Sequence, residues 1–215
     1  PLRLDFDGDG KNDLAFFRPS NQTWNIVRSR DGFTAVQFGL SSDKLVPADY
    51  DFDGKSDIAV FRPSNGFWYI LSSRTGEFSA IHFGLAEDIP VPADYVGDRR
   101  AEIAVFRPST GYCYIYNLSD NQFTAFNFGL SGDIPVPADY DGDGKDDISV
   151  FREGFWYQQR TTEGFTSIHF GMTGDKPFQS DFDGDGKADL SVLRPANRGW
   201  YFLKSRDGFT ARQFP

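Results

Sequence analysis

Groups of four carboxylates recur along the chain at a spacing that suits a cation. The fullest copy reads Asp-Tyr-Asp-Gly-Asp-Gly-Lys-Asp-Asp from Asp139 to Asp147, with aspartate at positions 1, 3, 5 and 9. A hard cation such as calcium takes six to eight oxygens, from carboxylates at such positions and from a backbone carbonyl at position 7. Glycine at position 6, here Gly144, permits the sharp turn because it tolerates positive φ. The spacing therefore predicts a calcium-binding loop.

Four copies of the loop keep the whole ligand set. With the position-7 lysine contributing its carbonyl, the expected ligands are Asp5, Asp7, Asp9, Lys11 and Asp13; Asp49, Asp51, Asp53, Lys55 and Asp57; Asp139, Asp141, Asp143, Lys145 and Asp147; and Asp181, Asp183, Asp185, Lys187 and Asp189. The loop from Asp94 to Glu102 is degenerate, because Val96 stands at position 3 and Arg99 at position 6. We expect four Ca²⁺ ions and none in this loop. There, Arg99 and Arg100 could place cationic groups at the ion position and pair with the loop's carboxylates.

Two other structures could produce acidic loops. Aspartate-rich turns form without metal when side chains bond nearby backbone groups, but four copies with one oxygen spacing favour a cation. A helical calcium hand needs a bidentate glutamate at position 12 and flanking helices, whereas position 12 here, Val150 for instance, falls in a predicted strand. The predicted ligand positions of the four intact loops account for 16 of the 31 acidic residues, and four divalent cations would bring the formal net charge of −9 to about −1. The acidity is thus concentrated at the predicted sites.

The loops divide the chain into five repeats. They begin at Asp5, Asp49, Asp94, Asp139 and Asp181, a period of 42 to 45 residues. Repeats of this length are typical of arrays of small sheets. We place the repeats at about 1–44, 45–89, 90–134, 135–176 and 177–215, within a single domain, 1–215.

Each repeat has the pattern of a four-stranded antiparallel sheet. A run such as Ile58–Phe61, apolar on both faces, follows the loop and fits a covered strand. Two further aromatic or β-branched runs come after it, bounded by Gly, Asn and Ser. The prolines before each loop cannot donate to a central ladder, so that segment is predicted as an edge strand. Radial packing of such sheets gives an all-β fold, a five-bladed β-propeller; the alternative is a segment of a larger propeller.

Composition excludes several classes of partner and chemistry. No basic patch interleaved with aromatics is present, which argues against nucleic acid. No apolar run approaches the roughly 20 residues that cross a bilayer, so membrane insertion is not expected. The single cysteine, Cys113, excludes an internal disulfide and lies in an apolar run that predicts a buried, inert thiol. No residue has a recognisable nucleophile context, so we expect no enzyme.

The loop D-x-D-x-D-G-x-x-D between two strands, with Phe-Gly at the end of each repeat, resembles the FG-GAP or VCBS repeats of integrin α-subunit propellers and of many secreted bacterial proteins. The resemblance covers essentially the whole chain. It implies calcium in loops that join the first two strands of a blade on one face, and ligands on the opposite face. Some proteins of this kind are lectins and some are calcium-containing polysaccharide lyases, so the fold alone does not fix the function.

The sequence therefore predicts a secreted or cell-surface binding or adhesion module, part of a larger polypeptide, with structural calcium and a carbohydrate or protein ligand. The alternatives are a non-catalytic scaffold, or an accessory or catalytic propeller of a polysaccharide-acting enzyme such as a lyase. Turn and inter-blade residues are the expected ligand contacts: Ser20, Asn21, Ser64, Asn65, Ser109 and Thr110, with Asp43, Asp88, Asp133 and Asp175.

Three recurring residue types have both a structural and a functional interpretation. Arginines end the second strand of every repeat and are expected to pair with carboxylates or carbonyls rather than to bind an anionic ligand: Arg18, Arg62, Arg107, Arg152 and Arg194. Tryptophans at equivalent positions are expected to fill the core rather than to face sugars: Trp24, Trp68, Trp156 and Trp200. His82 and His169 align with glutamine and asparagine, so no special role is expected for them.

Overall fold

The computed structural model describes residues 4–213, and these are built from strands, turns and loops. The strands form five antiparallel sheets. Four sheets have four strands, and the first has three within the described residues. No helix in this part of the chain is long and apolar enough to span a membrane.

Each sheet takes consecutive strands of the chain. The first contains β1 (Leu14–Arg18), β2 (Thr23–Arg28) and β3 (Gly32–Gln37). The second contains β4 (Lys44–Leu45), β5 (Ile58–Arg62), β6 (Phe67–Leu71) and β7 (Phe78–His82). The third contains β8 (Ile89–Pro90), β9 (Ile103–Arg107), β10 (Tyr112–Tyr116) and β11 (Phe123–Asn127). The fourth contains β12 (Ile134–Pro135), β13 (Ile148–Arg152), β14 (Phe155–Arg160) and β15 (Gly164–His169). The fifth contains β16 (Lys176–Ser180), β17 (Asp189–Arg194), β18 (Gly199–Lys204) and β19 (Gly208–Gln213).

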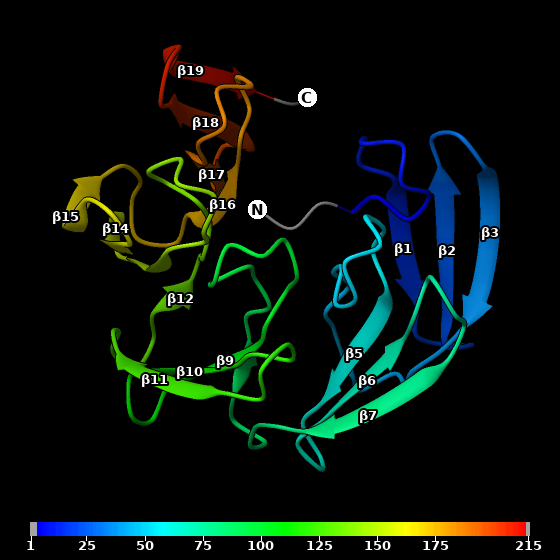
Figure 1. Cartoon of the computed structure of the whole chain (residues 1–215). Helices are drawn as coiled ribbons and strands as arrows, with labels where there is room; N and C mark the ends of the chain where they lie inside the picture. Colours follow the sequence, from blue (N-terminus) through cyan, green and yellow to red (C-terminus); the bar gives the residue numbers. More distant parts are fainter. Residues whose placement is uncertain (1–3, 214–215) are drawn as a thin grey trace.

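The five sheets are arranged around a common centre as the blades of a β-propeller (Figure 1). This confirms the predicted fold class. In the first blade the position equivalent to β4 lies outside the described residues, so three of its strands are described. Leu4 still follows the pattern of the other blades: its carbonyl accepts the Asp13 N–H at 2.6 Å, as the Ala48 carbonyl accepts the Asp57 N–H at 2.8 Å.

The proline-bearing segments are edge strands, as predicted. In the second blade β4 pairs only with β5, and β8 and β12 occupy the same place in the next two blades. These strands have only two residues each, because proline offers no N–H to a longer ladder. The last blade has Lys176–Ser180 instead, with one proline, and β16 is five residues long.

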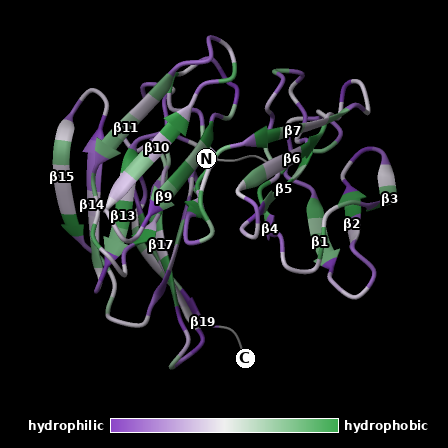
Figure 2. Cartoon of the chain, turned by 90° about the horizontal axis from the view of Figure 1, so that it is seen from below, coloured by the Kyte–Doolittle hydropathy of each residue, from purple (hydrophilic) through white to green (hydrophobic). Residues whose placement is uncertain are grey.

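The core lies between adjacent blades. Trp68 and Phe61 of the second blade pack with Ile103 and Val105 of the third, and all four are at most 1% exposed. Hydrophobic residues run along the strands, while hydrophilic residues occupy the connecting loops (Figure 2). The indole N–H of Trp68 donates to the Phe83 carbonyl at 2.7 Å, which satisfies its one polar group in the core.

The tryptophan prediction holds for the first, second and fourth blades, where Trp24, Trp68 and Trp156 are at most 2% exposed. Trp200 of the last blade is partly exposed. Cys113 takes the tryptophan position in the third blade and is buried, and burial raises the pKa of its thiol to about 12. The predicted burial of Cys113 is confirmed, and a raised thiol pKa favours low reactivity.

Four of the five arginines form two hydrogen bonds each with one aspartate, which confirms their structural role. In the second blade Arg62 Nε and Nη2 donate to the two carboxylate oxygens of Asp43 at 2.9 and 2.8 Å. The Asp43 side chain is fully buried and also accepts the Leu40 N–H. The pairs in the later blades are Arg107 with Asp88, Arg152 with Asp133, and Arg194 with Asp175. Each aspartate thus holds the loop between two blades.

Candidate metal centre

Three of the four aspartates in each intact loop organise the loop by accepting hydrogen bonds. In the fourth blade, Asp139 accepts the N–H groups of Gly142 and Gly144 at 2.6 and 2.9 Å. Asp143 accepts the Lys145 N–H, and Asp147 accepts the Tyr140 N–H at 2.9 Å. These bonds form the side-chain turns that aspartate favours, so both oxygens of Asp139 have partners. The aspartate at position 3 behaves differently.

One oxygen of every position-3 aspartate is buried and has no hydrogen-bond partner. Asp141 Oδ2 accepts the Thr162 and Glu163 N–H groups and the Thr162 hydroxyl, whereas Asp141 Oδ1 accepts none. The equivalent oxygens in the other three intact loops are orphaned in the same way: Asp7 Oδ1, Asp51 Oδ1 and Asp183 Oδ1. In the second loop Arg74 Nη2 lies 3.7 Å from Asp51 Oδ1, too far for a hydrogen bond. A buried carboxylate oxygen without a hydrogen bond is costly, so its recurrence at one position makes this oxygen the candidate cation ligand of each loop.

The aspartates that carry the orphaned oxygens lie close to other carboxylates. Each intact loop brings three ligand oxygens within 4.8 Å of one another: Asp5, Asp7 and Asp13; Asp49, Asp51 and Asp53; Asp139, Asp141 and Asp147; and Asp181, Asp183 and Asp189. The remaining predicted aspartates, Asp9, Asp57, Asp143 and Asp185, belong to the same loops but fall outside these triplets. Three carboxylates this close repel one another unless a cation or proton intervenes.

Burial and hydrogen bonding shift the pKa values of the carboxylates of one loop in opposite directions. Burial raises the pKa of Asp147 to about 6, and also that of Asp57. Burial acts in the same direction on Asp141, but hydrogen bonds from the Thr162 hydroxyl and from the backbone of Thr162 and Glu163 outweigh it and lower its pKa. The orphaned oxygen therefore belongs to a carboxylate that stays charged at neutral pH, as a cation ligand must.

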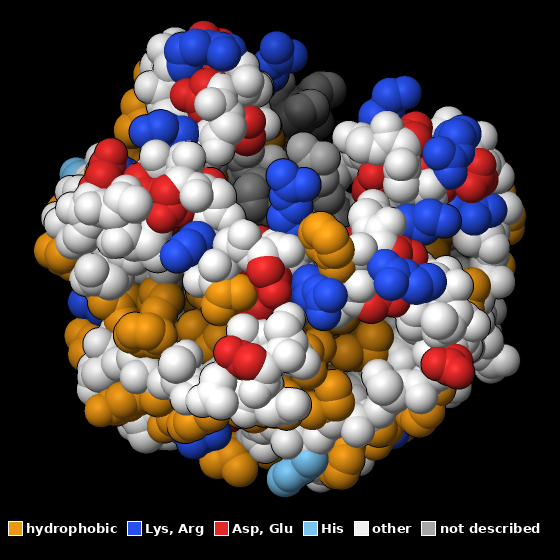
Figure 3. Space-filling view, in the orientation of Figure 1, with side chains coloured by type: hydrophobic (Ala, Val, Ile, Leu, Met, Phe, Trp, Pro, Cys, Tyr) orange, Lys and Arg blue, Asp and Glu red, His pale blue; other side chains and the backbone are white. Residues whose placement is uncertain are grey.

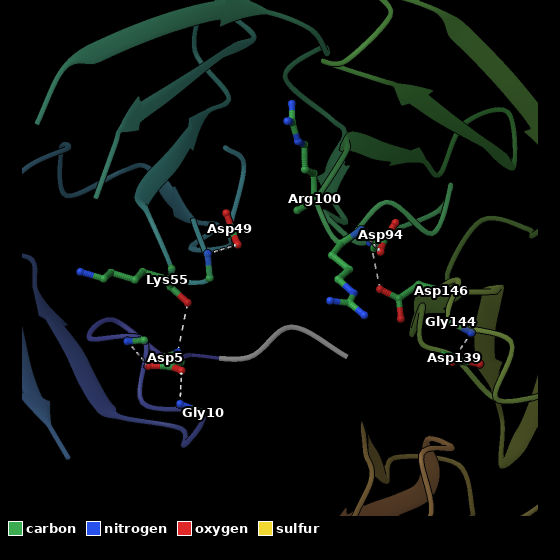
Figure 4. Close-up of a pocket in the computed structure, with 14 residues that line it drawn as sticks. Asp5, Gly10, Asp49, Lys55, Asp94, Arg100, Asp139, Gly144 and Asp146 are labelled. Carbon is green, nitrogen blue, oxygen red and sulfur yellow. Dashed lines mark hydrogen bonds between the residues drawn. The ribbon is translucent and has the colours of Figure 1, made fainter. Parts of the chain in front are cut away.

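The degenerate third loop keeps the hydrogen bonds of the intact loops, although it has no carboxylate at position 3. Asp94 accepts the N–H groups of Gly97 and Arg99 at 2.6 and 2.7 Å, as Asp139 does in the fourth blade. Arg99 has a φ of 68°, a value that glycine adopts at this position in the intact loops. The expectation that the arginines occupy the ion position is not met by Arg100, whose guanidinium lies 5.8 Å from the centre of the Phe52 ring and points away from Asp94 (Figure 4).

Adjacent loops are joined by a backbone ladder that the sequence reasoning missed. The N–H at position 8 of each loop donates to the position-1 carbonyl of the preceding loop: Ser56 to Asp5, Ala101 to Asp49, Asp146 to Asp94, and Ala188 to Asp139, at 2.6 to 2.8 Å. The position-7 side chain also covers position 4 of the preceding loop; a Cβ on Gly97 would lie 2.9 Å from Lys145 Cγ. The recurring basic residue at position 7 and the mostly glycine position 4 were the available sequence signals.

The loops surround a central cavity of about 610 Å³. Its wall includes the position-1 aspartates Asp5, Asp49, Asp94 and Asp139 together with Lys55, Arg99 and Arg100 (Figure 4). The Asp5, Asp49, Asp94 and Asp139 carboxylates already accept loop N–H groups, so the cavity wall presents few free acceptors.

The polar turns expected to contact a ligand lie at the opposite ends of the strands from the loops, and they are exposed: Ser20, Asn21, Ser64, Asn65, Ser109 and Thr110. Several of them make local bonds; Asn65 Nδ2 donates to the Tyr69 hydroxyl at 2.8 Å, and Ser109 donates to Glu87. Their role in ligand binding stays a prediction. The four inter-blade aspartates, also expected as ligand contacts, are instead buried and paired with arginine. A carboxylate that already accepts two guanidinium N–H groups has little capacity left to bind a ligand.

Residues 5–60 match the FG-GAP-like repeat, and these residues contain the first blade, the first two loops and the start of the second blade. The same loop and sheet recur in the remaining blades. Both findings fit an FG-GAP repeat propeller. No curated protein sequence matches the chain at a significant level.

Solved structures similar to this propeller share its fold at low identity. A streptogramin B lyase is 10% identical with a TM-score of 0.64, over 100% of this chain and 68% of its own. An Agrocybe aegerita lectin that recognises non-reducing terminal N-acetylglucosamine is 18% identical with a TM-score of 0.62, over 98% of this chain and 64% of its own. An auxiliary nutrient binding protein from Bacteroides ovatus is 11% identical with a TM-score of 0.63, over 98% and 56%. This chain thus spans about two thirds or less of the length of these structures.

Proposed function

We propose that this propeller is a calcium-stabilised binding module of secreted or cell-surface proteins, without catalytic activity of its own. The fold and the FG-GAP repeats support a binding module, since lectin and nutrient-binding proteins share the architecture. The observation that carries the calcium proposal is the orphaned position-3 oxygen in all four intact loops.

The donor set fits calcium. Each intact loop offers several carboxylate oxygens and a position-7 carbonyl, the hard oxygen ligands that calcium prefers, and contains neither histidine nor cysteine. Asp5, Asp7, Asp9, Lys11 and Asp13 would hold the ion in the first loop, with the equivalent residues in the other three. A bound ion would offset two of the three negative charges of the triplet and supply the partner that the position-3 oxygen lacks.

The role of calcium in this proposal is structural. The position-3 and position-9 aspartates bond the turn between the last two strands of their own blade: Asp141 accepts the Thr162 N–H, and Asp147 accepts the Thr161 N–H. An ion held by these carboxylates would fix that turn to the loop. Through the backbone ladder it would also stiffen the neighbouring loop. Sites in extracellular modules bind calcium at roughly 10⁻⁴–10⁻³ M, which suits millimolar calcium outside cells.

The ligand of the proposed module is a carbohydrate or a protein that binds the face away from the loops. On that face exposed polar turns lie beside aromatic rings. The His82 and Phe67 ring centroids lie 4.9 Å apart in a tilted pair, and His169 stacks on Phe155 with the ring centroids 4.3 Å apart. Aromatic faces beside amides and hydroxyls suit sugar rings as well as peptide side chains.

Two experiments test the proposal. Titration calorimetry of the chelator-treated chain should give four calcium ions per chain, and its thermal midpoint should rise in millimolar calcium. A stoichiometry of zero with an unchanged midpoint would show that the loops are turns only. A glycan array, followed by Asn65→Ala in a positive case, tests the ligand; a loss of binding at an unchanged midpoint supports this face. A scaffold would bind no glycan or protein, and an enzyme would release product from polysaccharides.

A further inference from the structure

The turn between the last two strands of a blade covers the loop of that blade. In the fourth blade the Thr161 N–H donates to Asp147 at 2.8 Å, and the Thr162 N–H donates to Asp141 Oδ2 at 2.9 Å. Serines donate in the same way to the position-9 aspartates of the other intact loops, and an arginine follows each serine. The equivalent residues are Arg30, Arg74, Thr162 and Arg206 in the first, second, fourth and fifth blades. Three intact loops thus have an arginine in the covering turn, and one has a threonine.

The arginine of the second blade lies beside the candidate cation ligand. Arg74 Nη2 is 3.7 Å from Asp51 Oδ1, the orphaned oxygen of that loop. The distance is too long for a hydrogen bond, but opposite charges still attract one another there. The next residue is Thr75, where the turns of the first and fifth blades have an aspartate. The positive charge of Arg74 is therefore directed at the loop and takes part of the place of a cation.

The second loop is also arranged differently from the other intact loops. In the first, fourth and fifth blades the three oxygens that lie within 4.8 Å of one another come from positions 1, 3 and 9. In the second blade they come from positions 1, 3 and 5, so Asp57 at position 9 falls outside the triplet. An ion that uses all four carboxylates would have to bring in Asp57 as well as displace Arg74.

The arginines of the first and fifth blades are held by other partners. Arg30 donates through Nη2 to the Asp7 carbonyl and through Nε to the Asp31 carboxylate at 3.0 Å. Arg206 makes the equivalent bonds in the fifth blade. In the space-filling view, Lys and Arg side chains lie beside Asp and Glu side chains over the first and the fifth blade (Figure 3). In these two blades a neighbouring aspartate offsets the charge of the turn arginine.

The covering turn of the fourth blade directs no cation at its loop. Thr162 donates its hydroxyl to Asp141 Oδ2 at 2.6 Å, and the next residue is Glu163. Glu163 forms an ion pair with Arg160, whose guanidinium also donates to Gln158, so the charges of Arg160 and Glu163 offset each other. The four intact loops therefore share one set of carboxylates but differ in the charge that faces them.

We propose that the residue in the covering turn sets the calcium affinity of each loop, and that Arg74 is a built-in competitor of the ion in the second blade. The inference rests on the calcium binding proposed above and concerns the order in which the four sites fill. A unit charge a few ångströms from a divalent ion lowers its affinity on the order of tenfold, even at the dielectric constant of water. The loop of the fourth blade should fill at the lowest calcium concentration, that of the second blade at the highest, and the other two between them.

Amide resonances can follow the four sites separately. The position-6 glycine of each intact loop donates its N–H to the position-1 aspartate, so Gly10, Gly54, Gly144 and Gly186 each report on one loop. The experiment is a calcium titration of the chelator-treated chain followed in ¹H–¹⁵N correlation spectra. We expect the lowest midpoint for Gly144 and the highest for Gly54, about tenfold or more apart. The gap should narrow at high salt, because the Arg74 side chain is 51% exposed and its charge is screened.

Substitutions in the covering turn separate charge from shape. Arg74→Gln should lower the calcium midpoint of Gly54 about tenfold and leave the other three midpoints unchanged. Arg74→Lys keeps the charge and should stay closer to the unmodified chain than Arg74→Gln does. In the fourth blade Thr162→Arg should raise the midpoint of Gly144. Its matched control is Thr162→Gln, which removes the hydroxyl without adding a charge and should raise that midpoint less.

Two results would overturn the inference and leave the proposed calcium binding intact. The first is a titration in which the four glycine resonances shift together. The second is an Arg74→Gln chain in which the midpoint of Gly54 does not move. A chain in which none of the four resonances responds to calcium would refute the calcium proposal itself, and this inference with it.

Discussion

The orphaned oxygen of Asp141 leads to a prediction whose sign depends on calcium. Asp141→Asn keeps an oxygen that accepts the Thr162 and Glu163 N–H groups, and it replaces the orphaned oxygen by an uncharged amide. In chelator the substitution removes one charge from a crowded triplet, so the thermal midpoint should stay unchanged or rise. In calcium the same substitution weakens one of four proposed sites.

The size of the calcium effect follows from mass action. At ten times the dissociation constant a site adds about 1.4 kcal/mol to the free energy of unfolding. In a domain of this length 1 kcal/mol corresponds to roughly 2–4 °C in the midpoint. Loss of one site should therefore lower the midpoint in calcium by about 3–6 °C, and the calorimetric stoichiometry should fall from four to three.

Differential scanning calorimetry in calcium and in chelator measures the thermal midpoint under both conditions. Val96→Asn is the matched control, since it places the same amide at position 3 of the degenerate loop; it should not change the difference between the two midpoints. An equal fall for Asp141→Asn in calcium and in chelator would mean that the carboxylate serves the apo fold, and the cation argument would fail.

Three further predictions concern the same framework. Burial raises the pKa of Glu102 from 4.5 to about 7, so the stability that its protonation contributes is present below pH 4.5 and is lost as the pH rises through 7. Glu102→Gln should remove about 3 kcal/mol of this pH dependence of the free energy of unfolding. The measurement is the difference between the thermal midpoints at pH 5 and pH 8 in chelator, which should become smaller. Arg107→Met leaves Asp88 buried and unpaired and should cost about 3–5 kcal/mol in urea unfolding, whereas a cost under about 1 kcal/mol would show that the pair is dispensable. Val96→Asp with Arg99→Gly should raise the calcium stoichiometry from four to five; an unchanged value would show that the third loop lacks more than these two residues.

The sequence predicted the features that depend on one repeat alone. The acidic spacing, the apolar run after each loop and the prolines before it act within about 45 residues. The loops lie where these patterns placed them, and so do the covered strands and the edge strands of the second to fifth blades. Cys113 was predicted to be buried because its neighbours in the strand are apolar, and it is. These inferences need only local propensity and periodicity.

Features that depend on two repeats were harder to predict. Asp43 looks like an ordinary turn residue, and its arginine partner is 19 residues away in the next blade, so its burial could not be inferred from the turn. The ladder from Ser56 to Asp5 uses backbone groups, which leave no residue preference of their own; only the basic position 7 and the mostly glycine position 4 packed beside it do. The angle between adjacent blades cannot be inferred from the length of the repeat either, because the packing of side chains across the interface sets it. Leu14 and Ile58 occupy equivalent positions in their repeats, yet Leu14 is 76% exposed and Ile58 is 8% exposed.

The third loop separates two roles of the loop carboxylates, which are accepting the N–H groups of the loop and offering an oxygen to a cation. Asp94 and Glu102 accept the loop's N–H groups as their counterparts do, and Asp94 still accepts the Asp146 N–H through its carbonyl, so the ladder continues through this loop without a position-3 carboxylate. If position 3 served only to fold the loop, Val96 would disturb these bonds, and it does not. Position 3 is therefore not needed for the hydrogen bonds within the loop itself. In the intact loops one of its oxygens binds the turn between the last two strands of the blade, and the other, orphaned oxygen supports the proposed cation site.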